Sequence, residues 1–181
     1  SRMLKKKNVF IWENVAFKFI NSDDRSLTFK YMHEILPNKL RLYNIKDIMS
    51  PNCNTCNIDE NNLHMMYYCK NNTVLIEFMK RLIKKCIGRN DVSMIKLLFL
   101  DTSGLYKRHS NTAVVLITNY SCTIWYNRDN HSDNKLNTLK RAILSKLRYH
   151  KIILGENMTK IFNNQYCQID MEFLDSIIVT N

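Results

Sequence analysis

Three cysteines and one histidine, side chains that commonly bind transition metals, occur within one seventeen-residue run of this chain. They are Cys53, Cys56, His64 and Cys69, in the spacing C-x2-C-x7-H-x4-C. Three thiolates and one imidazole complete the four-coordinate shell of a structural Zn²⁺ site and leave no position for water or substrate. The spacing therefore predicts a structural zinc ion that holds residues 50–70 together as a zinc-binding loop.

Other chemistry is compatible with part of this pattern. A C-x2-C pair alone is also found in redox dithiols and in disulfide-bonded proteins, and the four residues could be unrelated. Residues 1–7 lack the long apolar stretch of a signal peptide, so we expect a reducing compartment, which favours metal over disulfide. The remaining cysteines, at positions 86, 122 and 167, are expected to be free thiols that act as small hydrophobic residues.

The composition predicts a helical protein. The 181 residues include only three glycines and two prolines, whereas a sandwich or barrel needs many tight turns. With 45% hydrophobic and 24% charged residues, the chain can bury a sizeable core. We expect a mainly α fold, a compact helical bundle over residues 1–181 with the zinc loop inserted. No apolar run reaches the roughly 18 residues of a membrane span, so no membrane association is expected.

Hydrophobic periodicity and helix-terminating residues predict the elements that position the loop. Asp23 and Asp24 are expected to start the second helix, Gly88 to end the fourth, and Asp91 to cap the fifth. Helices or helical turns are predicted over residues 8–20, 23–36, 38–49, 71–86, 92–100, 110–127 and 134–153, with a closing segment over 168–178. The segment 110–127 is rich in β-branched residues, but its length and its lack of a turn favour a central buried helix.

A formal net charge of +11 makes nucleic acid the first partner to consider, although a solvated lysine-rich helix surface produces the same excess. The helices 71–86 and 134–153 each combine an apolar face with a basic face, on which we expect Lys135 as well. The candidate phosphate-binding residues are Lys80, Arg81, Lys84, Lys85, Lys140 and Arg141. Tyr67 or Tyr68 could stack on unpaired bases, but packing beneath the metal is the favoured expectation.

Three segments resemble the zinc-binding domain that follows the reverse transcriptase of non-LTR (LINE-type) retrotransposons, and they follow one another along the chain in the same order as in that family. Glu60–Cys69 is similar to its E-x-x-x-H element, 29–42 to its aromatic helix ending in Leu-Pro, and 124–129 to its Ile-Trp-x-x-Arg-Asn ending. The chain departs from that pattern at Asp129, where the family has Asn, and at Asn61, where Thr or Ser is common. The resemblance covers about residues 10–130, which leaves 131–181 as an unmatched, C-terminal helical extension.

The resemblance implies a helical module with zinc on the four residues named above, and RNA or target-DNA binding during retrotransposition, hence an intracellular, nuclear location. We find no paired metal-binding carboxylates of a polymerase, no phosphate loop and no nucleophile elbow, so we expect no enzyme. The histidines outside the loop, at 33, 109, 131 and 150, are expected at the surface or hydrogen-bonded in the core. The alternative function is a helical protein–protein interaction adaptor co-opted from such an element.

Overall fold

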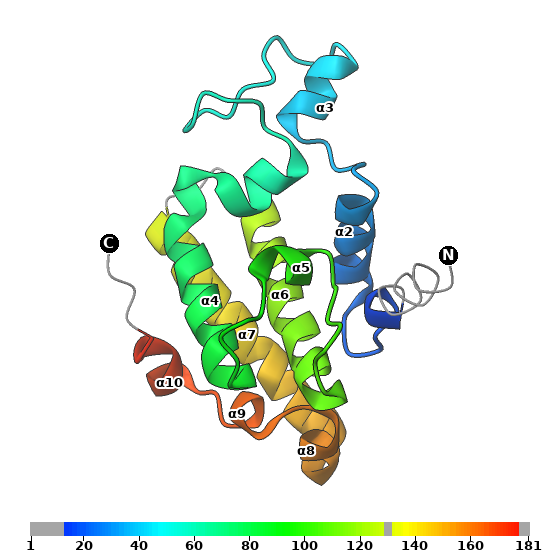
Figure 1. Cartoon of the computed structure of the whole chain (residues 1–181), viewed down its shortest axis with the longest axis vertical. Helices are drawn as coiled ribbons and strands as arrows, with labels where there is room; N and C mark the ends of the chain where they lie inside the picture. Colours follow the sequence, from blue (N-terminus) through cyan, green and yellow to red (C-terminus); the bar gives the residue numbers. More distant parts are fainter. Residues whose placement is uncertain (1–12, 129–131, 178–181) are drawn as a thin grey trace.

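A long buried helix, α6 (Lys107–Tyr126), lies at the centre of the molecule and contacts α2, α4, α5, α7 and α8 (Figure 1). The computed structural model describes residues 13–128 and 132–177. Polar side chains inside α6 bond to the preceding turn: Thr118 Oγ1 donates to the Val114 carbonyl at 2.6 Å and Asn119 Nδ2 to the Val115 carbonyl at 2.8 Å. Because these side chains are hydrogen-bonded within the helix, burying them costs little free energy. The predicted central buried helix is confirmed.

The helix α4 (Thr73–Ile87) packs beside α6 and carries the apolar stripe expected from the sequence. Leu75, Phe78, Met79 and Leu82 are buried along this stripe. Gly88 follows in the left-handed region with φ 72°, and its N–H donates to the Lys84 carbonyl at 2.8 Å. The helix and its glycine terminator are therefore confirmed.

The third long helix, α7 (Ser132–Leu154), packs against both α4 and α6. Leu139, Ile143 and Leu147 are buried in the common core, as expected. Lys135, however, is buried rather than on the outer face, being only 1% exposed. Its Nζ donates at 3.2 Å both to Asn72 Oδ1 and to the Arg128 carbonyl, so polar groups from two other segments hold it inward.

The helices before the zinc loop are shorter than predicted. Asn21, rather than Asp23 or Asp24, caps α2 (Ser22–Met32), because its side chain accepts from the Asp24 amide. The helix ends before Leu36: Glu34 takes a positive φ of 56°, and the Ile35 amide donates back to the Lys30 carbonyl. This arrangement is a Schellman termination. The next helix, α3 (Lys39–Asn44), is capped by the Asn38 side chain and covers only the first part of the predicted 38–49.

Residues 8–12 of the first predicted helix lie outside the described part of the chain. Residues 13–15 are helical, and the chain then turns instead of continuing as a helix to residue 20. The turn allows Phe17 and Phe19, two residues apart, both to contact the ring of Phe162, with centroids 6.2 and 5.7 Å away. A helix would have placed them on different faces.

Short helices complete the structure. Ser93, not Asp91, caps α5 (Met94–Leu98), while Asp91 forms an ion pair with Arg89. After α7 the chain forms η3 (Gly155–Asn157), α8 (Met158–Ile161), α9 (Asn164–Cys167) and α10 (Met171–Asp175). The predicted closing segment packs back through Leu174 and Ile177, which are buried, whereas Met171 is 43% exposed and Ile178 lies outside the described residues.

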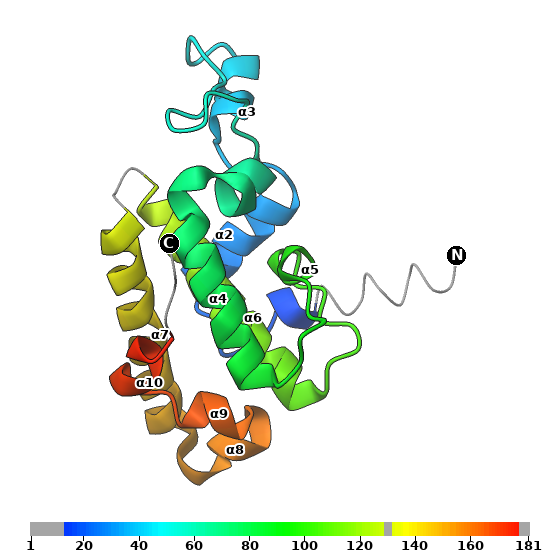
Figure 2. The same cartoon turned by 60° about the vertical axis from the view of Figure 1, so that its left-hand side comes forward.

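The mainly α fold is confirmed. Within the described ranges the elements are helical, apart from an isolated β-bridge between Asn52 and Asp59. The helix α3 and the first part of the zinc loop form a lobe that projects from one end of the helical bundle (Figure 2). None of the helices in the described ranges combines the length and the hydropathy needed to cross a membrane.

Candidate metal centre

The four predicted ligands converge. The sulfur atoms of Cys53, Cys56 and Cys69 and a ring nitrogen of His64 all lie within 4.8 Å of one another. The first two come from a turn in the projecting lobe, and the other two bracket η1 (His64–Tyr68), a π-helical turn at the end of the bundle. The centre therefore joins the lobe to the bundle.

The first half of the loop is a tight turn built without glycine. The Cys53 amide donates to the Ile58 carbonyl at 2.8 Å, and the Asn57 amide donates to the Cys53 carbonyl at 2.9 Å. Asn57 has a φ of 55°, a left-handed conformation that asparagine tolerates better than most other residues. The chain thus reverses directly after Cys56 and brings both cysteines to one side of the turn.

The second half depends on the unusual η1 turn. In a π-helix residues five apart are hydrogen-bonded neighbours, and the Cys69 amide donates to the His64 carbonyl at 2.8 Å. The x4 spacing between His64 and Cys69 therefore suits one π-helical turn. Asn61 caps the helical residues 62–63 that lead into this turn, because its Oδ1 accepts from the His64 amide at 2.7 Å. Ser or Thr can perform the same capping, so the departure from the family pattern at Asn61 preserves the geometry.

Buried hydrogen bonds fix η1 to the bundle. Tyr120 of α6 donates its hydroxyl to the Met66 carbonyl at 2.6 Å, and Asn72 Nδ2 donates to the Met65 carbonyl at 2.8 Å. Burial raises the pKa of Tyr120 well above its ordinary value, so the phenol stays a donor. On the lobe side, the Leu40 amide of α3 donates to the Glu60 carbonyl at 3.1 Å.

The sulfur positions fit a shared metal ion. Cys69 Sγ lies 3.7 Å from Cys53 Sγ and 4.0 Å from Cys56 Sγ. Disulfide sulfurs lie about 2.05 Å apart, whereas Zn–S bonds of about 2.3 Å place two tetrahedral ligands roughly 3.8 Å from each other. The Lys70 amide also donates to Cys56 Sγ at 3.3 Å, a contact that orients a metal-bound thiolate.

The histidine provides a second argument for a metal. His64 is only 3% exposed, and neither ring nitrogen has a hydrogen-bond partner within the described structure. Buried polar atoms are normally satisfied, and a metal bond would satisfy one of these nitrogens. Burial lowers the pKa of His64, which keeps the ring neutral and able to bind a cation.

Without a metal ion, Cys69 is held as a neutral thiol. Burial, with the adjacent Cys53 and Cys56 thiols, raises the pKa of Cys69 to about 12. Binding of a divalent cation would reverse this preference by stabilising the thiolates. Three sulfurs and one imidazole nitrogen suit Zn²⁺, with no position left for a reacting water.

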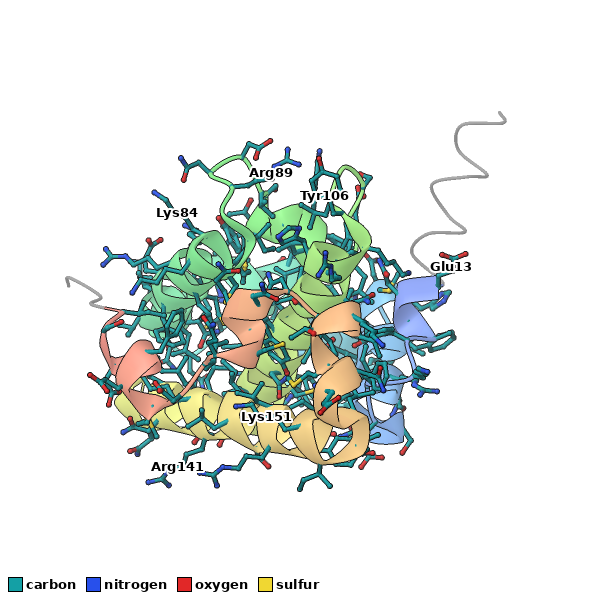
Figure 3. The ribbon with its side chains drawn as sticks, turned by 90° about the horizontal axis from the view of Figure 1, so that it is seen from below. Glu13, Lys84, Arg89, Tyr106, Arg141 and Lys151 are labelled. Atoms are coloured by element: carbon teal, nitrogen blue, oxygen red, sulfur yellow. The ribbon has the colours of Figure 1, made fainter. Side chains whose placement is uncertain are left out.

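The six predicted phosphate-binding residues do not form one surface. Lys80, Arg81 and Lys84 line a single groove, which Tyr67 also lines. Lys85 and Lys140 instead contact the C-terminal segment through Ser176 and Asp175, at 3.0 and 2.7 Å. Figure 3 shows Arg141 and Lys84 on opposite sides of the molecule. Arg89 and Asn90 also line the groove and were missed, because no local pattern marks them.

The three segments that carry the family resemblance meet in space. They surround a pocket of about 210 Å³, to which Pro37 and Leu42 contribute from residues 29–42, Glu60 and Cys69 from Glu60–Cys69, and Ile124 and Arg128 from residues 124–129. Comparisons with protein-family models, with curated proteins and with solved structures found no match to this chain. The case for the metal centre is therefore its own geometry.

Proposed function

We propose that this chain is a non-catalytic, zinc-stabilised nucleic-acid-binding module that works in the nucleus. We also propose that it is the counterpart of the domain after the reverse transcriptase of a non-LTR retrotransposon, either within such an element or as a stand-alone host protein. The meeting of the three resembling segments around one pocket supports this origin.

The observation that carries the proposal is the position of the metal centre at the start of a basic helix. Cys69 is followed immediately by η2 (Lys70–Asn72) and then by α4. A metal ion on Cys69 therefore orders the first turn of α4. Two turns further along, the side chains of Arg81 and Lys84 have no ion pair or hydrogen bond among the described residues, so their charges are available for phosphates.

The experiment is a salt titration of oligonucleotide binding with a charge reversal. We expect the zinc-loaded protein to bind RNA or DNA with an affinity that falls linearly on a plot of log K against log salt concentration. The double variant Arg81→Glu/Lys84→Glu should bind at least about ten-fold more weakly and reduce the slope by roughly 1 to 2, since each lost phosphate contact removes just under one unit. Fluorescence anisotropy measures both quantities.

The matched control is Arg148→Glu/Lys151→Glu, which makes the same charge change at exposed positions of α7. This control should retain the slope of the unmodified protein. Equal losses in both variants would mean that only net charge matters, and a flat salt response would refute the proposal.

A second candidate is a protein–protein interaction adaptor, and one observation favours it. The projecting lobe exposes apolar side chains: Met49 is 98% exposed, Ile45 64% and Ile58 55%. Such side chains are common at protein interfaces. Changing Lys80, Arg81, Lys84 and Lys85 of α4 to Glu and measuring both oligonucleotide binding and partner capture separates the two functions. A nucleic-acid-binding module should lose oligonucleotide binding, whereas an adaptor that binds through the projecting lobe should keep partner capture.

A further inference from the structure

The basic groove beside the metal centre has an apolar floor as well as charged walls. It lies between α4 and the segment that leads into α5, with a volume of about 420 Å³. Ile83 and Met94, which are 3% and 5% exposed, and the half-buried Val92 contribute the apolar surface. Lysine and arginine side chains alone are sufficient to attract a phosphate backbone. The apolar floor therefore needs a different explanation.

Tyr67 forms the end of the groove nearest the metal centre. It lies between two ligands, His64 and Cys69, so that the metal would position its ring. The ring is half-buried, and Lys80 Nζ lies 5.6 Å from its centroid while also bonding to Glu77 at 2.7 Å. The aromatic ring and one ammonium group are thus held in place before any ligand arrives.

We infer that this groove binds one unpaired nucleotide of a single-stranded nucleic acid. The base packs on Tyr67 and the apolar floor, while Arg81 and Lys84 contact the flanking phosphates. Bases offer apolar faces only when they are unpaired, because a duplex keeps those faces stacked inside. This inference rests on the proposed function and deepens it by naming the form of nucleic acid and its subsite.

The size and the charge of the groove favour a nucleotide over a partner protein. Its volume is at the lower end of the roughly 300–1,000 Å³ of small-ligand pockets. A partner helix would need an extended apolar groove with anchor sites several residues apart. Basic side chains at the groove also match the charge of a phosphodiester, and Lys84 points away from the bundle into solvent (Figure 3).

The test compares labelled oligonucleotides by fluorescence anisotropy on the zinc-loaded full chain. We expect single-stranded RNA or DNA to bind at least about ten-fold more tightly than the duplex of the same sequence, and than a strand of the same charge with abasic sites. Tyr67→Leu, which retains apolar packing but removes the ring, should weaken single-strand binding about ten-fold. Tyr67→Phe, which keeps the ring, should bind like the unmodified protein.

The abasic strand tests the inference even if Tyr67→Leu folds poorly, and zinc content and melting temperature identify that case. If the abasic strand and the duplex bind as well as the intact single strand, the nucleotide pocket is refuted while the proposed function stands. If no oligonucleotide binds, both are refuted. If polyglutamate displaces the strand as effectively as a competing oligonucleotide, the groove recognises acidic protein and the inference is overturned.

Discussion

At the scale of single residues, asparagine occupies helix-cap and turn positions that serine and glycine occupy in many other proteins. The side chains of Asn21, Asn38 and Asn163 each accept a backbone amide at the start of a helix, and Asn61 does the same for the helical residues 62–63 before η1. Asn57 takes the left-handed conformation that closes the metal turn. Because the chain contains only three glycines, asparagine supplies both helix caps and tight turns, and the metal ligands depend on two of these positions.

Replacement of one candidate metal ligand should remove the metal and destabilise the protein. Cys53→Ser should lose stoichiometric zinc and lower the melting temperature, because binding at a structural zinc site contributes on the order of 10 kcal/mol that is coupled to local folding. Elemental analysis and thermal melts measure the two effects. Cys167→Ser is the matched control, since this free thiol lies outside the cluster. Chelation of the unmodified protein should reproduce the Cys53→Ser phenotype.

Loss of the metal should unfold only the part of the chain around the metal centre. The core around α4, α6 and α7 is built from buried apolar residues that do not bind the metal. Hydrogen exchange should therefore accelerate over residues 38–72 while α6 stays protected. A melt that is indifferent to chelator would contradict a structural role for the metal.

At the scale of elements, the helix ends decide where each segment turns. Three helices before α6 end with a non-glycine residue at positive φ: Glu34, Lys46 and Leu100 follow α2, α3 and α5. The helix α4 instead ends at a glycine, and Gly88 directs the chain from the basic helix back along the groove towards Met94. The shape of the groove thus depends on one left-handed residue.

Gly88→Ala tests this dependence. A Cβ at Gly88 would meet no atom within 4 Å, so the cost is backbone strain alone. We expect a loss of about 1 kcal/mol in the free energy of unfolding, because left-handed conformation costs a residue with a side chain about 1–2 kcal/mol. Urea denaturation measures the loss. Gly88→Asn should cost less, since asparagine adopts this conformation more readily, and equal losses would exclude the conformational explanation.

At the scale of the whole molecule, buried polar contacts tie distant segments together. Asp24 of α2 accepts from Lys146 of α7 at 3.1 Å and from the Cys122 thiol of α6 at 3.2 Å. His150 of α7 connects to two further segments, with its ring nitrogens 3.1 Å from the Tyr166 hydroxyl and 3.2 Å from the Phe19 carbonyl. A hydrogen-bonded position in the core is one of the two environments expected for the histidines outside the loop. Residues 132–177 therefore share the core of residues 13–128.

His150 should make the stability of the fold sensitive to acid. Burial lowers its pKa from 6.5 to about 4, and nearby Lys146 lowers it too, although the hydrogen bond with Phe19 opposes the shift. The folded state thus binds a proton less readily than the unfolded state. The contribution is fully present above about pH 6.5 and declines as the pH falls towards 4, by at most about 1.4 kcal/mol per pH unit. Urea denaturation of the unmodified protein and of His150→Gln over this range should show a shallower decline for the variant; parallel declines would exclude His150 as the cause.

The sequence alone was sufficient for features that depend on local spacing. The four ligand positions, the apolar stripe of α4 and the length of α6 follow from periodicity, ligand spacing and helix terminators, and the structure confirms that these elements form and that the ligands converge. Zinc, nucleic acid and the family relationship stay predictions, because each depends on a partner or a relative rather than on the fold.

Only the tertiary structure decided which side chains share a surface. Sequence periodicity assigns a residue to one face of its own helix, but packing determines which neighbour covers that face. Lys135 belongs to a basic face by spacing, yet η2 and the end of α6 bury it. Lys84 and Arg141 belong to equivalent sequence patterns and yet lie on opposite sides of the molecule. Tyr67 shares a groove with Lys84 because η1 packs against α4.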